Sequence, residues 1–333
     1  MGLESGQWCA NLKWHEFVGH GLLAWKDGAL HRLLEQHEEG SSERIRDLLL
    51  GEYYFAYLPR LLVGDVDVDR ADFVRRDTFQ TGVGYGRYDL EWLISTCSIG
   101  LTVSDQHKEW VVGFDARKAI RVVEQFLIAR RALYETVYYH KTVRCAEGMM
   151  ALFLRRLKVV IRDGTKLLDS RIFAPLIDVI NGKAVGQRDL LSLDDSIIHL
   201  AIEMVALSDV KDETVRDLAR RVRERDLFKM VPVSEQALDK FITDGNWQKK
   251  LCETIKPYAR GDSEYYFHLD TRRFRVMSKK PREKVFLTKP NRDAEPAMDH
   301  PAFAPYRDEE DHLKSIYTVH EAVDAVRKLV EQA

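Results

Sequence analysis

The residues best suited to chemistry lie in one stretch, Gly64 to Leu90, which reads GDVDVDRADFVRRDTFQTGVGYGRYDL. If this stretch forms a helix with 3.6 residues per turn, the side chains of Asp69, Arg70, Phe73 and Asp77 fall within an arc of about 100°. A carboxylate can hold a metal ion, a guanidinium can hold a phosphate oxygen, and an aromatic ring can support a sugar. The spacing therefore indicates a site for a phosphorylated ligand, although a solvated charged helix would show the same spacing.

The segment that follows this helix contains three glycines in five residues, Gly82, Gly84 and Gly86, with Tyr85 and Tyr88 between and after them. Glycine is favoured where the backbone turns sharply or approaches another segment closely. The pattern predicts a shaped loop beside the charged helix rather than a plain surface.

The chain is predicted to be mainly helical up to about residue 230, because apolar residues recur there at helical spacing. Ser41 or Ser42 is a plausible N-cap for the third helix. The apolar and aromatic run Tyr53–Gly64 is expected to be buried. Helices are expected over Trp14–Asp27, Ala29–Glu38, Ser42–Leu50, Leu167–Asn181, Leu193–Leu207 and Asp212–Arg225.

The longest helical region, Asp115–Arg162, is predicted to be two helices or one bent helix. Ile120, Val123 and Leu127 form an apolar stripe. A second stripe at ideal helical pitch contains Arg130, Tyr134, Val137, Tyr138 and Lys141. Two interpretations stay open, a plain core in which the Arg130 stem covers the tyrosines and a site in which Arg130 meets an anionic partner.

Two short strand-like runs, Ile99–Val103 and Glu109–Val112, predict a hairpin. After about Val233 further strand-like runs appear, and Thr318–Ala333 reads as an amphipathic terminal helix. The expected fold is mainly α, with a helical domain over residues 1–235 and a small α+β region over residues 236–333.

The sequence HEFVGH (His15–His20) is not a zinc-protease motif. Its histidines are five residues apart, which separates them by about 140° on a helix, so they cannot share a metal ion from one face.

Composition limits the class of protein. Lys and Arg total 51 against 53 Asp and Glu, so no global basic field indicates nucleic-acid binding. No apolar run is long enough to cross a membrane, no signal pattern opens the chain, and the four cysteines form no C-x-x-C pair. We expect a cytoplasmic protein that does not bind a membrane.

Three blocks, in this order, resemble the HD-domain metal-dependent phosphohydrolases, and most closely the deoxynucleoside triphosphate triphosphohydrolases and their SAM-and-HD-domain relatives. They are DVDRADFVRRDTFQTGVGYGRYDL (67–90), LYETVYYHKTVRCAEGMM (Leu133–Met150) and RERDLFKMV (Arg223–Val231). The resemblance implies an all-helical HD-type core over residues 1–235, incomplete at its N-terminus, a nucleotide ligand and a homo-oligomer.

The resemblance also implies roles for particular residues. Asp69 would be a catalytic residue and a ligand of a divalent metal (Mn, Mg, Fe or Zn), and His15 a possible general acid. Arg225 and Lys229 would contact a regulatory nucleotide, although cations at a helix C-terminus are also common for structural reasons. The substrate would contact Arg70, Phe73, Asp77, Arg130, Tyr138, Tyr139 and His140.

The most serious departure from the family is that the chain contains no His-Asp dipeptide, and Arg70 and Phe73 stand where the family more often has lysine and tyrosine. The first hypothesis is a metal-dependent phosphohydrolase that acts on deoxynucleotides. The alternative is a catalytically inactive homologue that binds nucleotide or mediates assembly, because one aspartate cannot hold a transition metal alone. A nucleic-acid-binding protein that uses Arg272–Lys289 is a weaker third possibility.

Overall fold

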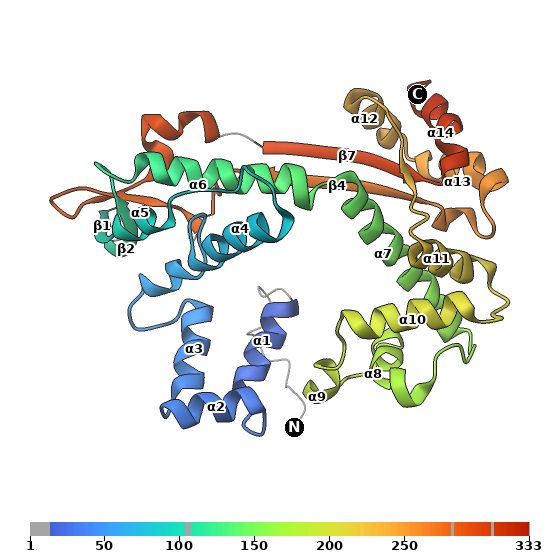
Figure 1. Cartoon of the computed structure of the whole chain (residues 1–333), viewed down its shortest axis with the longest axis horizontal. Coiled ribbons are helices and arrows are strands. Elements are labelled where there is room, and N and C mark those ends of the chain that lie inside the picture. The colour runs from blue at the N-terminus through green and yellow to red at the C-terminus, as the bar shows by residue number, and fades with distance from the viewer. Residues whose placement is uncertain (1–13, 104–107, 281–282, 308–309, 333) are drawn as a thin grey trace. The chain divides into compact units, whose positions relative to one another are not determined.

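The computed structural model describes residues 14–103, 108–280, 283–307 and 310–332, and its contacts divide the chain into two compact units. Unit 1 comprises Met1–Tyr134 with Arg275–Glu310, and unit 2 comprises Glu135–Phe274 with Asp311–Ala333. Most described residues are helical, and each unit has one small sheet (Figure 1). The mainly α fold with a small α+β part is therefore confirmed, while the domain boundary at residue 235 stays a prediction.

Three helices open unit 1 close to where they were expected, α1 (Trp14–Ala24), α2 (Ala29–His37) and α3 (Ser41–Leu50). The expected serine N-cap of α3 is wrong. Gly40 is the N-cap, and the Glu35 carboxylate accepts hydrogen bonds from the backbone N–H groups of Gly40 and Ser42, at 2.8 and 2.9 Å. A side chain from α2 therefore satisfies donors at the start of α3.

The aromatic run after α3 is not buried throughout, which corrects the prediction. Tyr54 is 89% exposed and Phe55 is 45% exposed, whereas the short 3₁₀ helix Leu58–Leu61 is half-buried. The aromatic residues pack on one another instead, with the rings of Tyr54 and Phe55 4.9 Å apart and edge-to-face. Apolar composition alone therefore did not predict the exposure of Tyr54 and Phe55.

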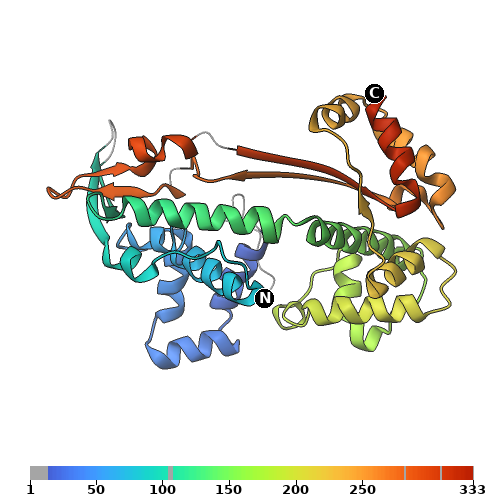
Figure 2. The ribbon, with the colours of Figure 1, turned by 45° about the horizontal axis from the view of Figure 1, so that its top comes forward.

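The core of unit 1 forms where α4 (Val68–Thr81) and α5 (Leu90–Ser95) pack against α6 (Ile120–Leu133). Figures 1 and 2 both show α4 beside α6. Val74 on α4 is fully buried, and α6 buries the predicted stripe at Val123 and Leu127. The face of α4 that carries Val74 and Thr78 is thus fixed by the core, which leaves its other faces for chemistry.

The predicted hairpin is confirmed as β1 (Cys97–Val103) paired antiparallel with β2 (Lys108–Asp115). The sheet continues with β5 (Phe286–Thr288), parallel to β2, and β6 (Ala294–Pro296), antiparallel to β5. A side chain at Gly113 would place its Cβ 2.6 Å from the Phe286 carbonyl oxygen, so this close strand contact requires glycine.

The region Asp115–Arg162 forms two helices, which was one of the two predicted alternatives. α6 ends at Leu133, a π-helical turn covers Tyr134–Tyr138, and α7 (Lys141–Arg162) begins after His140. A π turn winds more residues per turn than an α-helix. The second predicted stripe, which assumed ideal pitch from Arg130 to Lys141, is therefore wrong as a continuous face.

Unit 2 is a helical bundle with a three-stranded sheet in which β7 (Glu310–Thr318) lies between β3 (Lys229–Met230) and β4 (Phe267–Arg275). Its core includes the fully buried side chains of Phe153, Phe173, Phe241 and Tyr266. No helix in the described residues is long and apolar enough to cross a membrane. The remaining elements are α8 (Ser170–Ile180), α9 (Gln187–Leu190), α10 (Asp195–Leu207), α11 (Glu213–Glu224), β3 (Lys229–Met230), α12 (Glu235–Thr243), α13 (Trp247–Ile255), β4 (Phe267–Arg275), β7 (Glu310–Thr318) and α14 (Val323–Glu331).

Candidate functional site

The predicted charged helix begins with a buried cap. Asp67 is the N-cap of α4, and its carboxylate accepts hydrogen bonds from the backbone N–H of Arg70 at 2.6 Å and of Gly64 at 2.9 Å. Burial raises the pKa of Asp67 above its ordinary value, and these hydrogen bonds only partly offset that effect. The cap fixes the start of α4, and with it the direction of the next residues.

Asp65, two residues before the cap, is the anion at the centre of the site. Its side chain is only 3% exposed, and Arg70 Nη1 donates to its Oδ1 atom at 2.8 Å. The backbone N–H of Ser278 donates to the other carboxylate oxygen, and the backbone N–H of Asp65 donates to the Glu283 carbonyl at 2.8 Å. Segments far apart in the sequence therefore meet at this carboxylate.

Arg130 reaches the same carboxylate from α6. Its side chain is 4% exposed, and its Nη1 atom lies 3.3 Å from Asp65 Oδ1 and donates to the Asp65 carbonyl at 2.8 Å. Its Nη2 atom donates to the Val276 carbonyl at 2.6 Å. Burial lowers the pKa of Arg130, while Asp65 raises it. An arginine stays charged even so, which makes Asp65 the anionic partner that the buried guanidinium requires.

Arg70 and Arg130, which were both predicted to contact the substrate, thus meet at a carboxylate of the chain itself. Asp65 was not among the predicted site residues, because the predicted helix face began at Asp69. The signal was present in the alternating acids of GDVDVD, which place a carboxylate before the helix as well as in it. Whether the two arginines also meet a phosphate stays a prediction.

Asp69 stands apart from this buried cluster. It lies in the first turn of α4, is exposed, and its carboxylate makes no hydrogen bond or ion pair with the described residues. Arg70 beside it is 26% exposed, so one face of its guanidinium reaches solvent. Arg70 also lies 3.7 Å from the Asp67 carboxylate and 3.9 Å from the Glu283 carboxylate. Asp65, Asp67, Asp69 and Glu283 therefore give four carboxylates against the two guanidiniums of Arg70 and Arg130. Without a cation, this balance disfavours a phosphate group.

A resident metal ion does not fit the described donors. Among the residues that the structure describes, no three His, Cys, Asp or Glu side chains lie together in a way that could hold one. Asp65 and Asp67 are held by arginines and backbone N–H groups, which leaves Asp69 as a single ligand. The predicted general acid, His15, lies in α1, and its side chain is not among those that the structure describes.

The other predicted substrate residues divide between the two units. Phe73 and Asp77 are half-buried on α4 in unit 1. In unit 2, Tyr138 is half-buried in the π turn, and Tyr139 packs edge-to-face on Phe274 with ring centroids 6.4 Å apart. His140 is the exposed N-cap of α7, where its Nδ1 atom accepts from the Thr142 N–H at 3.3 Å. Their roles stay predictions.

The proposed regulatory residues lie at the end of α11. Arg225 is exposed and ends the helix with φ of 57°, a left-handed conformation that is uncommon outside glycine. Lys229 is exposed in β3. The basic run near Arg272–Lys289 is extensively paired, since Arg272 Nε lies 3.1 Å from Asp270 and Lys280 Nζ lies 2.8 Å from Glu283. Those pairs reduce the field available to a nucleic acid.

Comparison with known sequences gives distant relatives, and no family model matches. The uncharacterized protein YwfO of Bacillus subtilis is 26% identical over 217 residues, which cover 65% of this chain and 47% of that protein. The uncharacterized protein MJ1154 of Methanocaldococcus jannaschii is 28% identical over 170 residues, 51% of this chain and 30% of that protein. The chain thus spans about half the length of the first relative and less of the second.

Comparison with solved structures gives the fold. A phosphohydrolase from Bacteroides thetaiotaomicron matches 90% of this chain and 74% of its own, with a TM-score of 0.61 and 20% identity. A hypothetical protein from Aquifex aeolicus matches 91% of this chain and 69% of its own, with a TM-score of 0.59 and 22% identity. The chain therefore shares the fold of these two solved proteins, one of which is a phosphohydrolase.

Proposed function

We propose that this chain acts on deoxynucleoside triphosphates as an HD-type phosphohydrolase, and that the nucleotide enters as its complex with a divalent cation. One observation carries the proposal most directly. Arg70, in the first turn of α4, is held by the buried carboxylate of Asp65, and the residue before it, Asp69, is an exposed carboxylate that has no partner among the described residues.

The proposed roles of Asp65 and Asp69 differ because Asp65 is buried and Asp69 is exposed. The buried Asp65 holds Arg70 and Arg130 in place, so the solvent-facing side of Arg70 is oriented before a ligand arrives. A guanidinium in that position can bind a phosphate oxygen with charge-assisted hydrogen bonds. Asp69 supplies the negative charge that favours a cation-bearing nucleotide over the free tetra-anion. The cation is part of the substrate here, because the described residues supply no complete metal site.

The resemblance of three sequence blocks and the shared fold support the choice of substrate class. The blocks resemble those of triphosphohydrolases that act on deoxynucleotides, and the fold is similar to that of a solved phosphohydrolase. A homo-oligomer remains part of the proposal on the resemblance alone.

The test is release of inorganic phosphate or triphosphate from each of the four deoxynucleoside triphosphates, with Mn²⁺, Mg²⁺ or no added cation. We expect release only with a cation, and a loss of about 10-fold or more in Asp69→Asn, because that variant removes the exposed charge without changing its size.

Arg76→Gln is the matched control, since Arg76 lies on another face of the same helix and is held by Asp72 at 2.8 Å. It should release product at the wild-type rate. Nucleotide binding without release under every condition would contradict the hydrolase and leave a nucleotide-binding module. No binding and no release would reject the site.

A further inference from the structure

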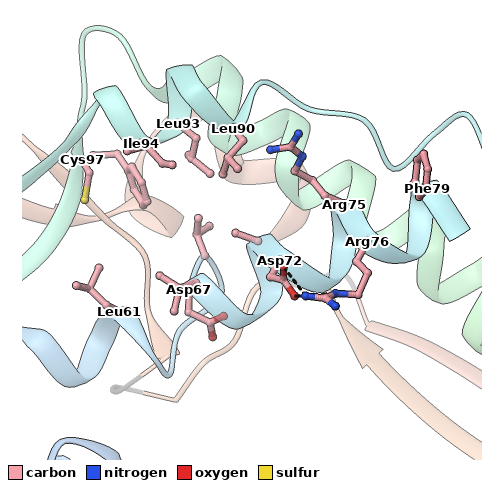
Figure 3. Close-up of a pocket in the computed structure, with 14 residues that line it drawn as sticks. Leu61, Asp67, Asp72, Arg75, Arg76, Phe79, Leu90, Leu93, Ile94 and Cys97 are labelled. Carbon is pink, nitrogen blue, oxygen red and sulfur yellow. Dashed lines mark hydrogen bonds and ion pairs between the residues drawn. The ribbon is translucent and has the colours of Figure 1, made fainter. Parts of the chain in front are cut away.

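A second feature of α4 is a cavity that adjoins the proposed phosphate site, because Asp67, the N-cap that lies 3.7 Å from Arg70, also lines it. Residues of α4 line this cavity of about 750 Å³ together with α5 (Figure 3). The wall is largely apolar and includes Leu90, Leu93, Ile94 and Phe114. Its charged members are Asp67, Arg75 and the ion pair of Asp72 with Arg76. Pockets of this size and apolar character are typical of small-molecule sites.

Large apolar side chains around this cavity are unusually exposed. Phe79 is 83% exposed, Ile94 is 60% exposed and Val68 is 52% exposed. Water contact with so much apolar surface is unfavourable, and burying it would stabilise whatever covers it by about 25 cal/mol per Å². The apolar wall explains why a ligand would bind, but not which ligand.

A smaller cavity of about 380 Å³ adjoins the first and shares two of its walls, Arg75 and Phe79. Its far side is formed by the loop 82–88, here called the glycine loop, and includes Arg87 and Tyr88. Two guanidiniums, those of Arg75 and Arg87, therefore line a cavity that opens beside an apolar one.

These two guanidiniums are distinguished by their lack of partners. Neither Arg75 nor Arg87 makes a side-chain hydrogen bond or an ion pair with any described residue, whereas Arg76 on the same helix is held by Asp72. Tyr88 does not neutralise them. Its hydroxyl donates to the Ala71 carbonyl at 2.7 Å, and burial raises its pKa to about 12, so it stays an uncharged phenol.

We propose that these joined cavities bind a small amphipathic anion. Its carboxylate or phosphate head lies between Arg75 and Arg87, and its apolar body lies against Leu93 and Ile94. The argument is charge complementarity, because unpaired cations at one end of an apolar cavity match a molecule with a negative head and an apolar body. The site is separate from Asp65, Asp69 and Arg70.

The probes are decanoate and decyl phosphate, each titrated into the full chain by calorimetry below its micelle concentration. Decanol has the same chain without charge, and inorganic phosphate has a charge without the chain. We expect both anionic probes to bind and both controls to bind at least about 10-fold more weakly, since each lacks one half of the recognition. The two anionic probes also show whether the site prefers a carboxylate or a phosphate head.

Variants locate the site. Arg75→Gln and Arg87→Gln should each weaken the anionic probes about 10-fold or more, because each removes a charge-assisted hydrogen bond. Ile94→Ser should weaken them through lost apolar contact. Arg121→Gln is the matched control, as this arginine is exposed on α6, pairs with Glu124 at 2.9 Å, and lines neither cavity. Circular dichroism should show the same helix content for all four variants.

Three results would overturn the proposal. Decanol could bind as tightly as decanoate, which would show that charge plays no part. Arg121→Gln could weaken binding as much as Arg75→Gln, which would show a non-specific effect of charge. Light scattering could show a dimer that Ile94→Ser separates into monomers, which would make the cavity an interface between two copies of the chain.

Discussion

At the scale of single residues, the site is decided by which carboxylate is buried and which is exposed. Asp65 and Asp69 are four residues apart, yet Asp65 is held by two guanidiniums and a backbone N–H, whereas Asp69 faces solvent. The sequence indicated an acid and a cation on one face of α4. The sequence could not indicate that Asp65, which precedes the helix, would be buried and would hold Arg70. The position of Asp65 depends on its contact with Arg130 from α6.

Asp65→Ala should destabilise the chain strongly. The change leaves the buried guanidinium of Arg130 without its counter-charge, and removing one partner of a buried ion pair costs about 3–5 kcal/mol. Urea unfolding followed by circular dichroism measures the change in the free energy of unfolding. The control is Asp72→Ala, which breaks the exposed pair with Arg76 and should cost less than about 1 kcal/mol. Equal losses in the two variants would contradict the assigned role of Asp65.

A second prediction concerns Asp217 in unit 2. Burial raises the pKa of Asp217, but hydrogen bonds from Arg220 and Arg221, both 2.8 Å, and from the Tyr266 hydroxyl outweigh burial and hold the pKa below its usual 3.8. The folded chain therefore binds fewer protons than the unfolded chain in acid. The stability that Asp217 contributes is present above about pH 4 and is lost as the pH falls through the folded-state pKa.

Asp217→Asn should accordingly lower the free energy of unfolding by about 1.5–3 kcal/mol near neutral pH, as expected for charge-assisted hydrogen bonds. The difference from wild type should shrink below about pH 4. Urea unfolding at a series of pH values measures it. Asp178→Asn, at an exposed pair with Lys183, is the control and should show little difference at any pH. If the difference in the free energy of unfolding between wild type and Asp217→Asn did not change with pH, the assigned pKa of Asp217 below 3.8 would be wrong.

At the scale of elements, most helices lie where periodicity placed them, because a buried stripe such as Val123 and Leu127 is a local property of the sequence. The predictions were wrong where contacts between separate elements determine the local structure. Glu35 caps α3 from the preceding helix, and the π turn at Tyr134–Tyr138 interrupts a stripe that assumed regular pitch. Neither feature has a local signal strong enough to predict it.

The glycine loop offers a matched pair of substitutions. A Cβ at Gly86 would lie 1.7 Å from Thr78 Oγ1 and 3.0 Å from its Cβ, whereas a Cβ at Gly84 would meet nothing within 4 Å. Gly86→Ala should therefore push the loop away from α4 and destabilise the chain by about 1–3 kcal/mol. Gly84→Ala should be neutral or slightly stabilising, because it restricts only the unfolded chain. Thermal unfolding compares them, and a neutral Gly86→Ala would show that the loop does not depend on this contact.

At the scale of the whole molecule, the fold class could be predicted from the sequence and the site only in part. Apolar periodicity predicted a mainly helical chain, and the three blocks pointed to the phosphohydrolase-like fold that the solved structures share. Arg70 and Arg130 were predicted to contact a substrate, which stays a prediction, and their contact with the Asp65 carboxylate was not predicted. The exposed apolar cavity beside α5 was missed altogether, because its walls come from segments whose meeting no local pattern encodes.

The central claim is that the exposed side of Arg70 binds a nucleotide phosphate. Isothermal titration calorimetry of each deoxynucleoside triphosphate with Mn²⁺ into wild type, Arg70→Gln and Arg76→Gln tests it most directly. We expect Arg70→Gln to weaken the tightest Kd by about 10- to 100-fold, because a charge-assisted hydrogen bond is lost, and Arg76→Gln to leave that Kd unchanged. Equal Kd values for wild type and Arg70→Gln would contradict the claim.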